Sequence, residues 1–356
     1  MAGKEGIGLR IAWIAVQNGA RQLSMGKANG SAIGVEIGVS GAKAVHVRQS
    51  GGRVVLEGCM EEEGGAFFSG TASERGAALR RLVKGVGGGR KQVGVALSSG
   101  TMFLRLFEQP ETPVAALREA MRLNGPVLFN QDCRGYLMDC GLVDRAKASG
   151  EGVKRRYLAG GILRSEVEAW SEACRMGGME VGCIQISSVS TLNAFEHACP
   201  EAFGGGGFLL LDLGQTGFTI MAGSGGELML LRVLEGGGRA LMEELSAGGA
   251  VPESRVFAEL EGAGMRDRVR LGVAGLVRQV LASVGFLESR VGGDVTRVHV
   301  SGGKWGGITG VLSEELQMEC VPWNPLGDGL SSGAPEGLHA ACGAALQVLG
   351  VPAVAG

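Results

Sequence analysis

The sequence has little of several things that often point to a function. Aromatic residues make up only 5% of its 356 residues, it holds 4 histidines, and its formal net charge is -2. Because Lys and Arg nearly balance Asp and Glu, no basic field exists to concentrate nucleic acid or anionic lipid on the surface. We therefore expect no nucleic-acid partner and no direct attachment to lipid.

Cysteine pairs and long apolar runs are also missing. The 8 cysteines form no C-x-x-C pair and lie near no histidine at metal-ligand spacing, so we expect reduced, buried thiols rather than a metal site or a disulfide framework. The apolar run Ile11–Val16 is shorter than the ~20 residues that span a bilayer and than the signal-peptide core of about 7–15 residues. We expect no membrane span, and an N-terminal arm at residues 1–30 that need not be ordered.

Glycine is abundant, with 65 residues, and two of its clusters mark an internal repeat. Residues 31–49 read as two strands joined by Gly38-Val-Ser-Gly41, and residues 208–222 as two strands joined by Gly214-Gln-Thr-Gly217. Each copy is an apolar strand ending in an acid and an apolar residue, then the glycine turn with its hydroxyl residue, then a second strand. A duplication over so long a distance predicts two lobes of like topology rather than a solenoid.

Strand and helix patterns alternate along the rest of the chain, which favours an α/β fold. One predicted helix begins with Ser165 as its cap, and another is entered through Pro113. The predicted helices span residues 73–86, 113–123, 165–176, 190–198, 239–246, 269–290 and 338–349, and the further strands residues 92–97, 102–107, 156–163, 180–186 and 295–300.

Each glycine turn is a candidate phosphate site. Successive backbone N–H groups, which glycine lets approach an oxyanion closely, make a concave nest for phosphate. The acids that end the preceding strands, Glu36 and Asp212, cannot bind phosphate themselves because like charges repel. Their useful role is to hold Mg²⁺, usually through water. For either copy alone, an ordinary glycine turn is the alternative.

Other residues beside the turns are open to two interpretations. Lys43 could reach a terminal phosphate as a point charge, or be a solvated strand lysine. Ser40 and Thr216 could donate hydroxyls to phosphate or satisfy their own turns. The loop Ser301-Gly302-Gly303 follows a predicted strand and could pass close to a flat base, or simply connect that strand to a helix.

The ordered set of motifs resembles the actin-like ATPase superfold and, within it, the type IV pilus assembly protein PilM family. The resemblance runs from about residue 31 to 350, and each piece of it is loose. The segments that carry it are Gly34 to Lys43, Leu211 to Gly217, Ser301 to Gly303, Arg105 to Pro110, Leu231 to Gly237, Ile308 to Pro325 with its Asn324-Pro325, and His339 to Gly350.

The resemblance implies a two-lobed, ribonuclease H-like α/β fold that binds ATP and Mg²⁺ in the cleft between the lobes. Lobe I would span residues 31–205 with an inserted subdomain at about 93–164, lobe II residues 206–337, and a C-terminal helix and tail, 338–356, would return to lobe I. The candidate cofactor-binding set is Gly38, Ser40, Gly41, Lys43, Gly214, Gln215, Thr216, Gly217, Gly237, Gly238, Ser301, Gly302 and Gly303, with Glu36 and Asp212 at the metal.

The resemblance also implies a cytoplasmic scaffold that is peripheral to the inner membrane through a partner. It would dock the N-terminal cytoplasmic peptide of an inner-membrane pilus protein of the PilN type in a groove supplied by the inserted subdomain. Two departures affect these expectations. Asn124-Gly125 interrupts the helix that should continue through Pro126 to Phe129, which alters the groove, and residues 248–264 lack the glutamate-lysine helix that clasps ribose and adenine in relatives.

Two other functions stay open at this point. One is a degenerate scaffold of a related secretion system that binds partners without nucleotide. The other is a small-molecule kinase of the same superfold, although Asp132, Asp139 and Asp144 fall in no recognisable catalytic context. Whether ATP is hydrolysed also stays open, because no residue stands out as a water-positioning base.

Overall fold

The computed structural model divides the chain into two compact units. Unit 1 comprises Met1–Pro200, Asn324–Ala334 and Leu338–Gly356, and unit 2 comprises Glu201–Trp323 and Pro335–Gly337. Of the expected arm at residues 1–30, residues 1–29 lie outside the described residues, and so does the tail after Gly350. The structure describes residues 30–64, 67, 70–87, 92–144, 154–247, 249–260, 262–291, 294–330 and 336–350.

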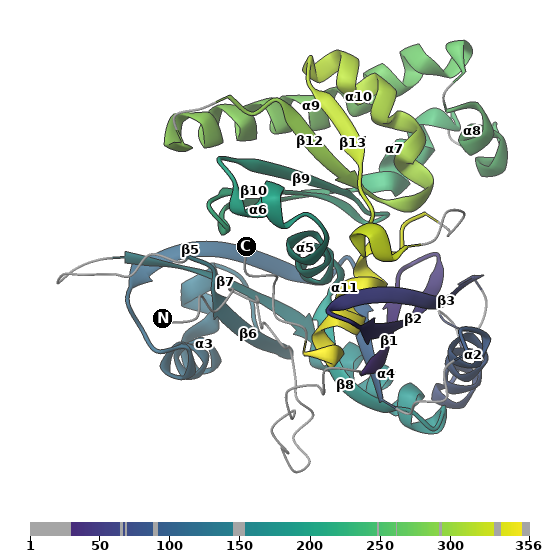
Figure 1. Cartoon of the computed structure of the whole chain (residues 1–356), viewed down its shortest axis with the longest axis vertical. Coiled ribbons are helices and arrows are strands. Elements are labelled where there is room, and N and C mark those ends of the chain that lie inside the picture. The colour runs from purple at the N-terminus through teal and green to yellow at the C-terminus, as the bar shows by residue number, and fades with distance from the viewer. Residues whose placement is uncertain are drawn as a thin grey trace. The chain divides into compact units, whose positions relative to one another are not determined.

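A five-stranded mixed sheet forms the centre of unit 1, with the strand order β3-β2-β1-β4-β8 (Figure 1). The first three strands are antiparallel, and β4 and β8 continue the sheet in parallel with β1. The apolar run of β1 is buried almost throughout because it lies in the middle of the sheet. The strands are β1 (Ser31–Ile37), β2 (Gly41–Ser50), β3 (Arg53–Glu63), β4 (Gln92–Leu97) and β8 (Glu180–Ile186).

The C-terminal helix α11 (His339–Leu349) packs against β1, β4 and α5 (Ser187–Ala198) of unit 1. Its small residues allow a very close approach to the sheet. A Cβ on Gly34 of β1 would lie 1.8 Å from Ala341 O, and one on Gly94 of β4 would lie 2.3 Å from Ala344 O. Both strand glycines are therefore required for α11 to fit.

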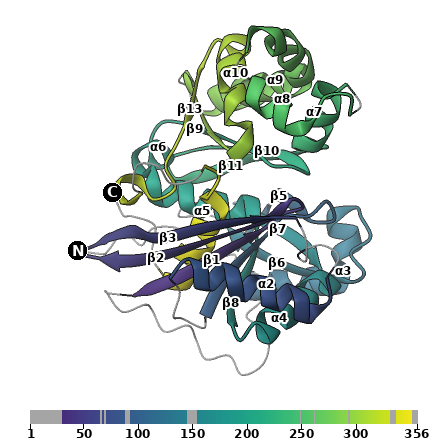
Figure 2. The ribbon, with the colours of Figure 1, turned by 90° about the vertical axis from the view of Figure 1, so that its right-hand side faces the viewer.

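Two further helices, α2 (Ala72–Gly85) and α4 (Arg164–Met176), lie side by side in unit 1 (Figure 2). Thr71 and Glu74 form a reciprocal capping box at the start of α2. The expected Ser165 cap of α4 is wrong, because the helix already begins at Arg164 without a side-chain cap. The backbone N–H of Arg164 donates instead to Gly135 O at 2.7 Å, which turns the chain directly out of the preceding strand.

A second, three-stranded antiparallel sheet with the order β5-β7-β6 lies in the segment after β4. Its aromatic core includes Phe103, Phe129 and Tyr157. The expected inserted subdomain at about 93–164 began too early, because the buried run of β4 pairs in parallel with β1 in the larger sheet. We call this sheet and its helix the subdomain; its elements are β5 (Phe103–Pro110), α3 (Val114–Phe129), β6 (Tyr136–Leu142) and β7 (Lys154–Leu163).

Unit 2 repeats the sheet of unit 1, with the strand order β11-β10-β9-β12-β13 and the same pattern of antiparallel and parallel pairs. The duplication predicted from the two glycine turns is thus confirmed in the topology. The strands are β9 (Phe208–Leu213), β10 (Gly217–Ser224), β11 (Glu227–Glu235), β12 (Arg297–Ser301) and β13 (Glu319–Pro322).

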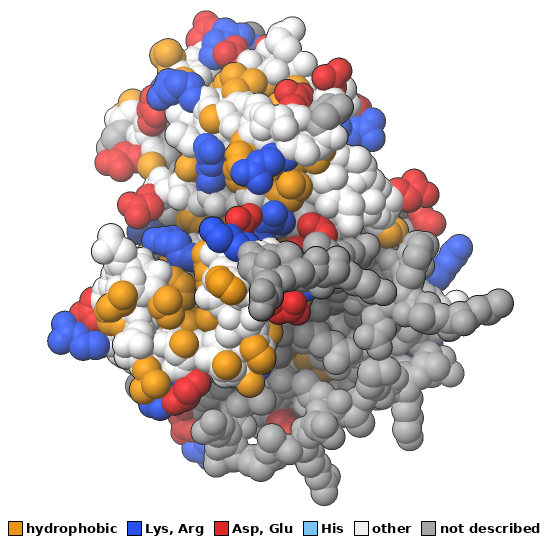
Figure 3. Space-filling view, turned by 90° about the vertical axis from the view of Figure 1, so that its left-hand side faces the viewer, with side chains coloured by type: hydrophobic (Ala, Val, Ile, Leu, Met, Phe, Trp, Pro, Cys, Tyr) orange, Lys and Arg blue, Asp and Glu red, His pale blue; other side chains and the backbone are white. Residues whose placement is uncertain are grey.

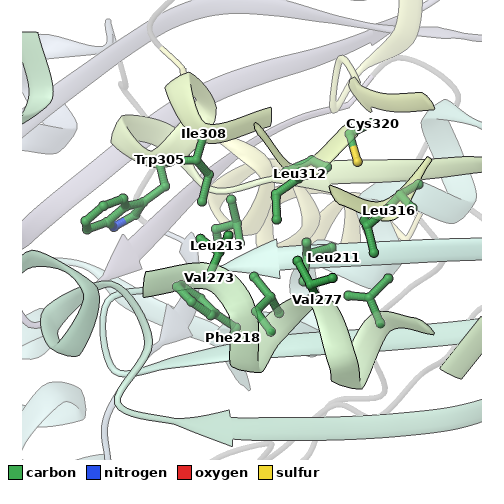
Figure 4. Close-up of a cluster of buried hydrophobic side chains, with 14 of the residues drawn as sticks. Leu211, Leu213, Phe218, Val273, Val277, Trp305, Ile308, Leu312, Leu316 and Cys320 are labelled. Carbon is green, nitrogen blue, oxygen red and sulfur yellow. The ribbon is translucent and has the colours of Figure 1, made fainter. Parts of the chain in front are cut away.

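The helices of unit 2 cover one continuous hydrophobic core, part of which Figure 4 shows. Leu211 and Leu213 of β9 and Phe218 of β10 lie there with Val273 and Val277 of the long helix α9. The helical elements are α6 (Pro200–Gly204), which begins at the boundary of the units, α7 (Gly237–Leu245), α8 (Glu253–Glu259), α9 (Ala263–Val291), η1 (Gly303–Ile308) and α10 (Thr309–Leu316), and a further short turn, η2 (Gly327–Gly329), lies in unit 1.

Helix α9 is the one helix among the described residues that is long and apolar enough to cross a membrane by length and composition. A core helix passes the same test. Val269, Val280 and Leu287 of α9 are completely buried in the unit 2 core, while Arg270 pairs with Glu315 of α10 at 2.6 Å. This apolar stripe is accounted for by packing within unit 2.

Candidate functional site

The first glycine turn joins β1 to β2 at the end of the unit 1 hairpin. The N–H of Gly38 donates to Gly41 O at 3.0 Å and closes the turn. The backbone N–H groups of Val39 and Ser40, between them, have no acceptor within the part of the chain that the structure describes. Successive unpaired N–H groups of this kind are what an anion nest requires.

The second glycine turn, between β9 and β10, leaves the matching N–H groups unpaired. Among the described residues, those of Gln215 and Thr216 find no acceptor. The carbonyls of this turn are used differently, because Gly214 O accepts from Gly238 N–H and Gln215 O from Arg239 N–H, each at 2.9 Å. The turn thus caps the first turn of α7 with its carbonyls and keeps its own N–H groups available.

The acids beside the two turns have different neighbours. Ser301, the last residue of β12, donates its hydroxyl to Asp212 Oδ1 at 2.7 Å and is 2% exposed. It thereby fixes the orientation of that carboxylate. The residue that pairs with Glu36 at the same place in the unit 1 sheet is Ala96, which has no hydroxyl to donate.

Lys43 stands opposite Glu36 in the hairpin and pairs with Glu61 of β3 at 3.8 Å. Its side chain is 20% exposed. A lysine with so little exposure and a carboxylate beside it is not a fully solvated strand lysine. Both interpretations drawn from the sequence therefore survive in part, since an anion at the turn would compete with Glu61 for the ammonium group.

Several candidate glycines are required by contacts of the chain with itself. A Cβ on Gly237 would lie 2.4 Å from the N of Gly217, and one on Gly302 would lie 2.5 Å from the Cβ of Leu213. Gly302 and Gly303 also have φ values of 129° and 43°, which residues with side chains rarely adopt. These glycines hold the loops of unit 2 against β9, so their presence alone does not identify a ligand.

The cysteines offer no nucleophile near either turn. Burial raises the pKa of the Cys174 and Cys183 thiols to about 12, and it raises that of Cys342, whose thiol also senses Glu36. Cys59 and Cys199 are partly buried, and the pKa of both is raised by burial as well. These thiols are inert apolar packing groups at neutral pH.

Two aromatic residues next to the unit 2 turn were missed by the sequence analysis. Trp305 lies just after the glycine loop of β12, and its indole nitrogen lies against Gly238. Phe257 of α8 contacts the Trp305 ring edge-on, with 5.1 Å between the ring centroids. In a chain with 4 tryptophans, one placed within three residues of Gly302 was the available signal.

Each hairpin gathers its own set of candidate residues. In unit 2 the structure brings together Asp212, the β9–β10 turn, the glycines that open α7, and Ser301. In unit 1 it places Glu36, Lys43 and the β1–β2 turn on one hairpin. The two hairpins belong to different units, and their meeting around one ligand stays a prediction.

Helix α3 of the subdomain presents an exposed apolar surface, which we call the α3 surface and which comprises Leu123, Val127 and Leu128. These side chains are 62%, 83% and 46% exposed. Figure 3 shows hydrophobic side chains gathered on this side of unit 1. The helix that was expected to end at residue 123 kinks at Asn124 (φ -130°, ψ 24°) and then resumes. It resumes because Phe129 is anchored in the subdomain core, 5.4 Å from the Phe103 ring.

Comparisons with known proteins bear on the fold. No family model matches the chain, and no curated protein matches it in sequence. A chain of a solved PilM-PilN type IV pilus biogenesis complex superposes with a TM-score of 0.73 at 20% identity, covering 89% of this chain and 98% of that chain.

Two other solved structures are more distant. The ethanolamine utilization protein EutJ from Carboxydothermus hydrogenoformans gives a TM-score of 0.49 at 14% identity, with 89% of both chains covered. A Bacteroides thetaiotaomicron protein of actin-like ATPase fold and unknown function gives 0.48 at 12% identity, covering 87% of this chain and 96% of that chain. The resemblance predicted from the sequence is thus confirmed at the level of the fold: the chain has the actin-like α/β fold of the chain in the PilM-PilN complex.

Proposed function

We propose that the chain is an actin-like, nucleotide-binding scaffold of a type IV pilus assembly platform. The observation that carries this proposal is the match over 98% of a chain in the PilM-PilN complex, at a TM-score of 0.73. The proposal places the protein on the cytoplasmic side of the inner membrane, where it is held through a partner.

In this proposal the ligand is ATP with Mg²⁺, bound by both glycine turns. The unpaired N–H groups of Val39 and Ser40, and of Gln215 and Thr216, suit phosphate oxygens. Lys43 would exchange Glu61 for the terminal phosphate. When bound, the metal ion neutralises the phosphates.

The metal ion would be held through water by Glu36 and Asp212. The hydrogen bond from Ser301 keeps the Asp212 carboxylate in a fixed orientation, which suits a ligand of Mg²⁺ or of its water shell. The two acids come from the two units, so this assignment requires one ligand to contact both hairpins.

The carboxylates that a kinase would need are engaged elsewhere. Asp139 bonds to Arg118 within the subdomain, and Asp144 accepts from Arg155 at 2.7 Å, where both side chains are buried. Asp132 pairs with an arginine of its own turn. These ion pairs have structural roles, so the residues favour a scaffold over the kinase alternative.

The nucleotide part of the proposal is tested by thermal unfolding of the full chain with Mg-ATP. A ligand present at 100 times its Kd stabilises the protein by about 2.7 kcal/mol. We expect Glu36→Ala and Asp212→Ala each to reduce the Mg-dependent shift, and Glu168→Ala, an exposed acid of α4, to leave it unchanged. No shift of the wild type at millimolar ATP would favour the scaffold without nucleotide.

The partner in this proposal is the N-terminal cytoplasmic peptide of an inner-membrane protein of the PilN type. The α3 surface supports this choice, because exposed apolar side chains next to a helix kink can contact the apolar side chains of an extended peptide. Three such side chains on one exposed helix would otherwise be an unfavourable solvent contact.

The partner is tested by co-purification from native membranes, followed by binding of the recovered protein's N-terminal peptide to purified variants. Val127→Glu with Leu128→Glu is expected to weaken peptide binding by about tenfold or more, since a charge would face an apolar contact. Leu271→Glu, at an exposed leucine of α9 in unit 2, is the matched control. Equal binding by the two variants would move the docking site away from α3.

A further inference from the structure

Trp305 fills the space between two glycine loops of unit 2. It lies in η1, immediately after the loop that follows β12, and is 1% exposed. A Cβ added to Gly238 would lie 2.1 Å from the indole Nε1 and 2.8 Å from Gln215 Oε1. The ring therefore rests on the start of α7 beside the β9–β10 turn, and Figure 4 shows it directed away from the other labelled core side chains.

A second aromatic residue supports the ring from α8. Phe257 meets Trp305 at an interplanar angle of 64° with 5.1 Å between centroids, and the Lys304 ammonium lies 5.8 Å from the Phe257 centroid. This helix follows α7 in the chain. Apolar and edge-to-face contacts of this kind hold the ring without any polar anchor.

The indole N–H is left without a partner. Trp305 Nε1 is buried and finds no acceptor among the residues that the structure describes. A buried donor without an acceptor weakens the packed position, because in water it would be hydrogen-bonded. The ring is therefore held by shape and apolar contacts alone. A flat ligand could occupy the same space only if the ring moved out of it.

The free backbone donors near this ring suit phosphate oxygens. The N–H groups of Gln215 and Thr216 are unpaired, whereas the first N–H groups of α7 are already bonded to the turn. A Cβ on Gly302, in the loop that was predicted to pass close to a base, would lie 2.5 Å from the Cβ of Leu213.

We propose that Trp305 occupies the space between the glycine loops of unit 2 and thereby keeps a nucleoside base out of it. The site then binds a Mg-polyphosphate group without selecting the base attached to it. This inference rests on the proposed nucleotide function and narrows its ligand class. ATP, GTP, UTP and inorganic tripolyphosphate should bind alike, because the free backbone N–H groups of the turn suit the phosphate chain that all four share.

The test is calorimetric titration of the full chain, with Mg²⁺, against these four ligands. The wild type is expected to bind them with affinities within about threefold of one another, well below the roughly tenfold or more that one base-stacking contact is worth. Trp305→Ala removes the ring and opens its space to a base. This variant is expected to bind the nucleotides about tenfold more tightly than tripolyphosphate. Trp170→Ala, at a buried tryptophan of unit 1, is the matched control and should leave the four affinities alike.

The titrations distinguish the lack of base selectivity from the phosphate site on which it depends. A wild type that prefers ATP over tripolyphosphate by about tenfold, the worth of one stacked base, overturns the inference and leaves the nucleotide site standing. Trp305→Ala with four unchanged affinities also overturns it. Binding of none of the four by the wild type overturns the proposed phosphate site and the inference together.

A spectroscopic measurement covers the case in which Trp305→Ala does not fold. With Trp13, Trp170 and Trp323 replaced by Phe, Trp305 is the only tryptophan that emits. A closed ring should be poorly quenched by acrylamide, and equally so with and without Mg-ATP. Strong quenching of Trp305 fluorescence in the free protein, or a marked rise in quenching when Mg-ATP is added, would contradict a Trp305 ring that stays buried.

Discussion

The two glycine hairpins occupy the same place in sheets of the same strand order, and yet their side chains are supported differently. Asp212 receives a hydrogen bond from Ser301, whereas Glu36 faces Ala96 at the matching position. The two copies thus share their backbone arrangement, including two unbonded N–H groups in each turn, but differ in the side chains next to the acid. The serine hydroxyl that bonds the acid of the unit 2 hairpin therefore has no counterpart at the matching position of unit 1.

The helices that cover the two central strands differ as well. Gly34 of β1 lets α11 approach until the backbones touch, while the corresponding residue of β9, Leu210, is a completely buried side chain. At this position a glycine lets a helix backbone approach β1 directly, whereas a large side chain fills the corresponding space at β9. Both solutions exclude water from the middle of the sheet.

The largest expected effect comes from a substitution at the close contact between β1 and α11. Gly34→Ala would place a Cβ 1.8 Å from Ala341 O, a backbone atom that cannot move alone, so we expect a loss of about 3 kcal/mol or more in the free energy of unfolding. Denaturant titration measures it. Gly310→Ala, where a Cβ meets open space in α10, should be neutral or slightly stabilising. Equal stability of the two variants would contradict the close approach of α11.

The second prediction concerns the support of the two acids. Ser301→Ala removes the hydrogen bond to Asp212 and is expected to weaken Mg-ATP binding by about tenfold, since a bond to a charged group is worth about 1.5–3 kcal/mol. Ala96→Ser supplies a hydroxyl at the matching place beside Glu36 and should not weaken binding. Ser224→Ala, whose hydroxyl bonds Gly206 O at the far end of β10, is the control. A Ser301→Ala variant that binds like this control would remove Asp212 from the site.

The third prediction uses the lysine that only the first hairpin has. Thr219, which is buried, stands where Lys43 stands in the other hairpin. Lys43→Met should lower affinity for ATP more than for ADP, because the ammonium is assigned to the terminal phosphate, and should change stability by less than about 1 kcal/mol. Glu61→Gln, which removes the ion pair between Lys43 and Glu61, should not lower ATP affinity. An equal loss for ATP and ADP on Lys43→Met would argue against that assignment.

The smallest effect compares a partly buried histidine in each unit. Burial lowers the pKa of His197 in unit 1 and of His299 in unit 2, where Arg297 adds to the effect and Glu319 opposes it. The unfolded chain then binds protons that the folded chain resists, so stability is fully present above the ordinary histidine pKa of 6.5 and falls as the pH drops below it. Denaturant titrations between pH 8 and pH 5 measure this loss.

Replacing the two histidines in turn shows which unit is responsible for this pH dependence. His197→Phe and His299→Phe should each flatten the pH dependence, relative to the wild type, by removing one titrating group. A chain whose stability rises on acidification through this range would contradict both assignments.

The duplication was visible in the sequence because its signals are local: an acid, glycines and a hydroxyl residue at fixed spacing between two apolar strands. Strand β3 escaped prediction because it is an edge strand whose acidic end, Glu61 to Glu63, breaks the alternation. Strand β6 was missed because Asp139 and Gly141 interrupt its apolar pattern.

The candidate site was only partly predictable, for a related reason. The turns, Asp212 and Ser301 could be found from spacing, but the pairing of Ser301 with Asp212 depends on β12 lying beside β9. The same holds for the contact of Trp305 with Gly238, which joins residues far apart in the chain. Sequence patterns report what a residue requires locally and not which distant side chain fills the space beside it.

The central claim, that the two hairpins bind one magnesium–nucleotide, is tested most directly by a double-mutant cycle of Glu36→Ala and Asp212→Ala read out as Mg-ATP affinity. If both acids hold the same ion, removing the second after the first should cost much less than removing it from the wild type, giving a coupling energy of about 0.5–3 kcal/mol. Losses that simply add, or an affinity that neither substitution changes, would contradict the claim.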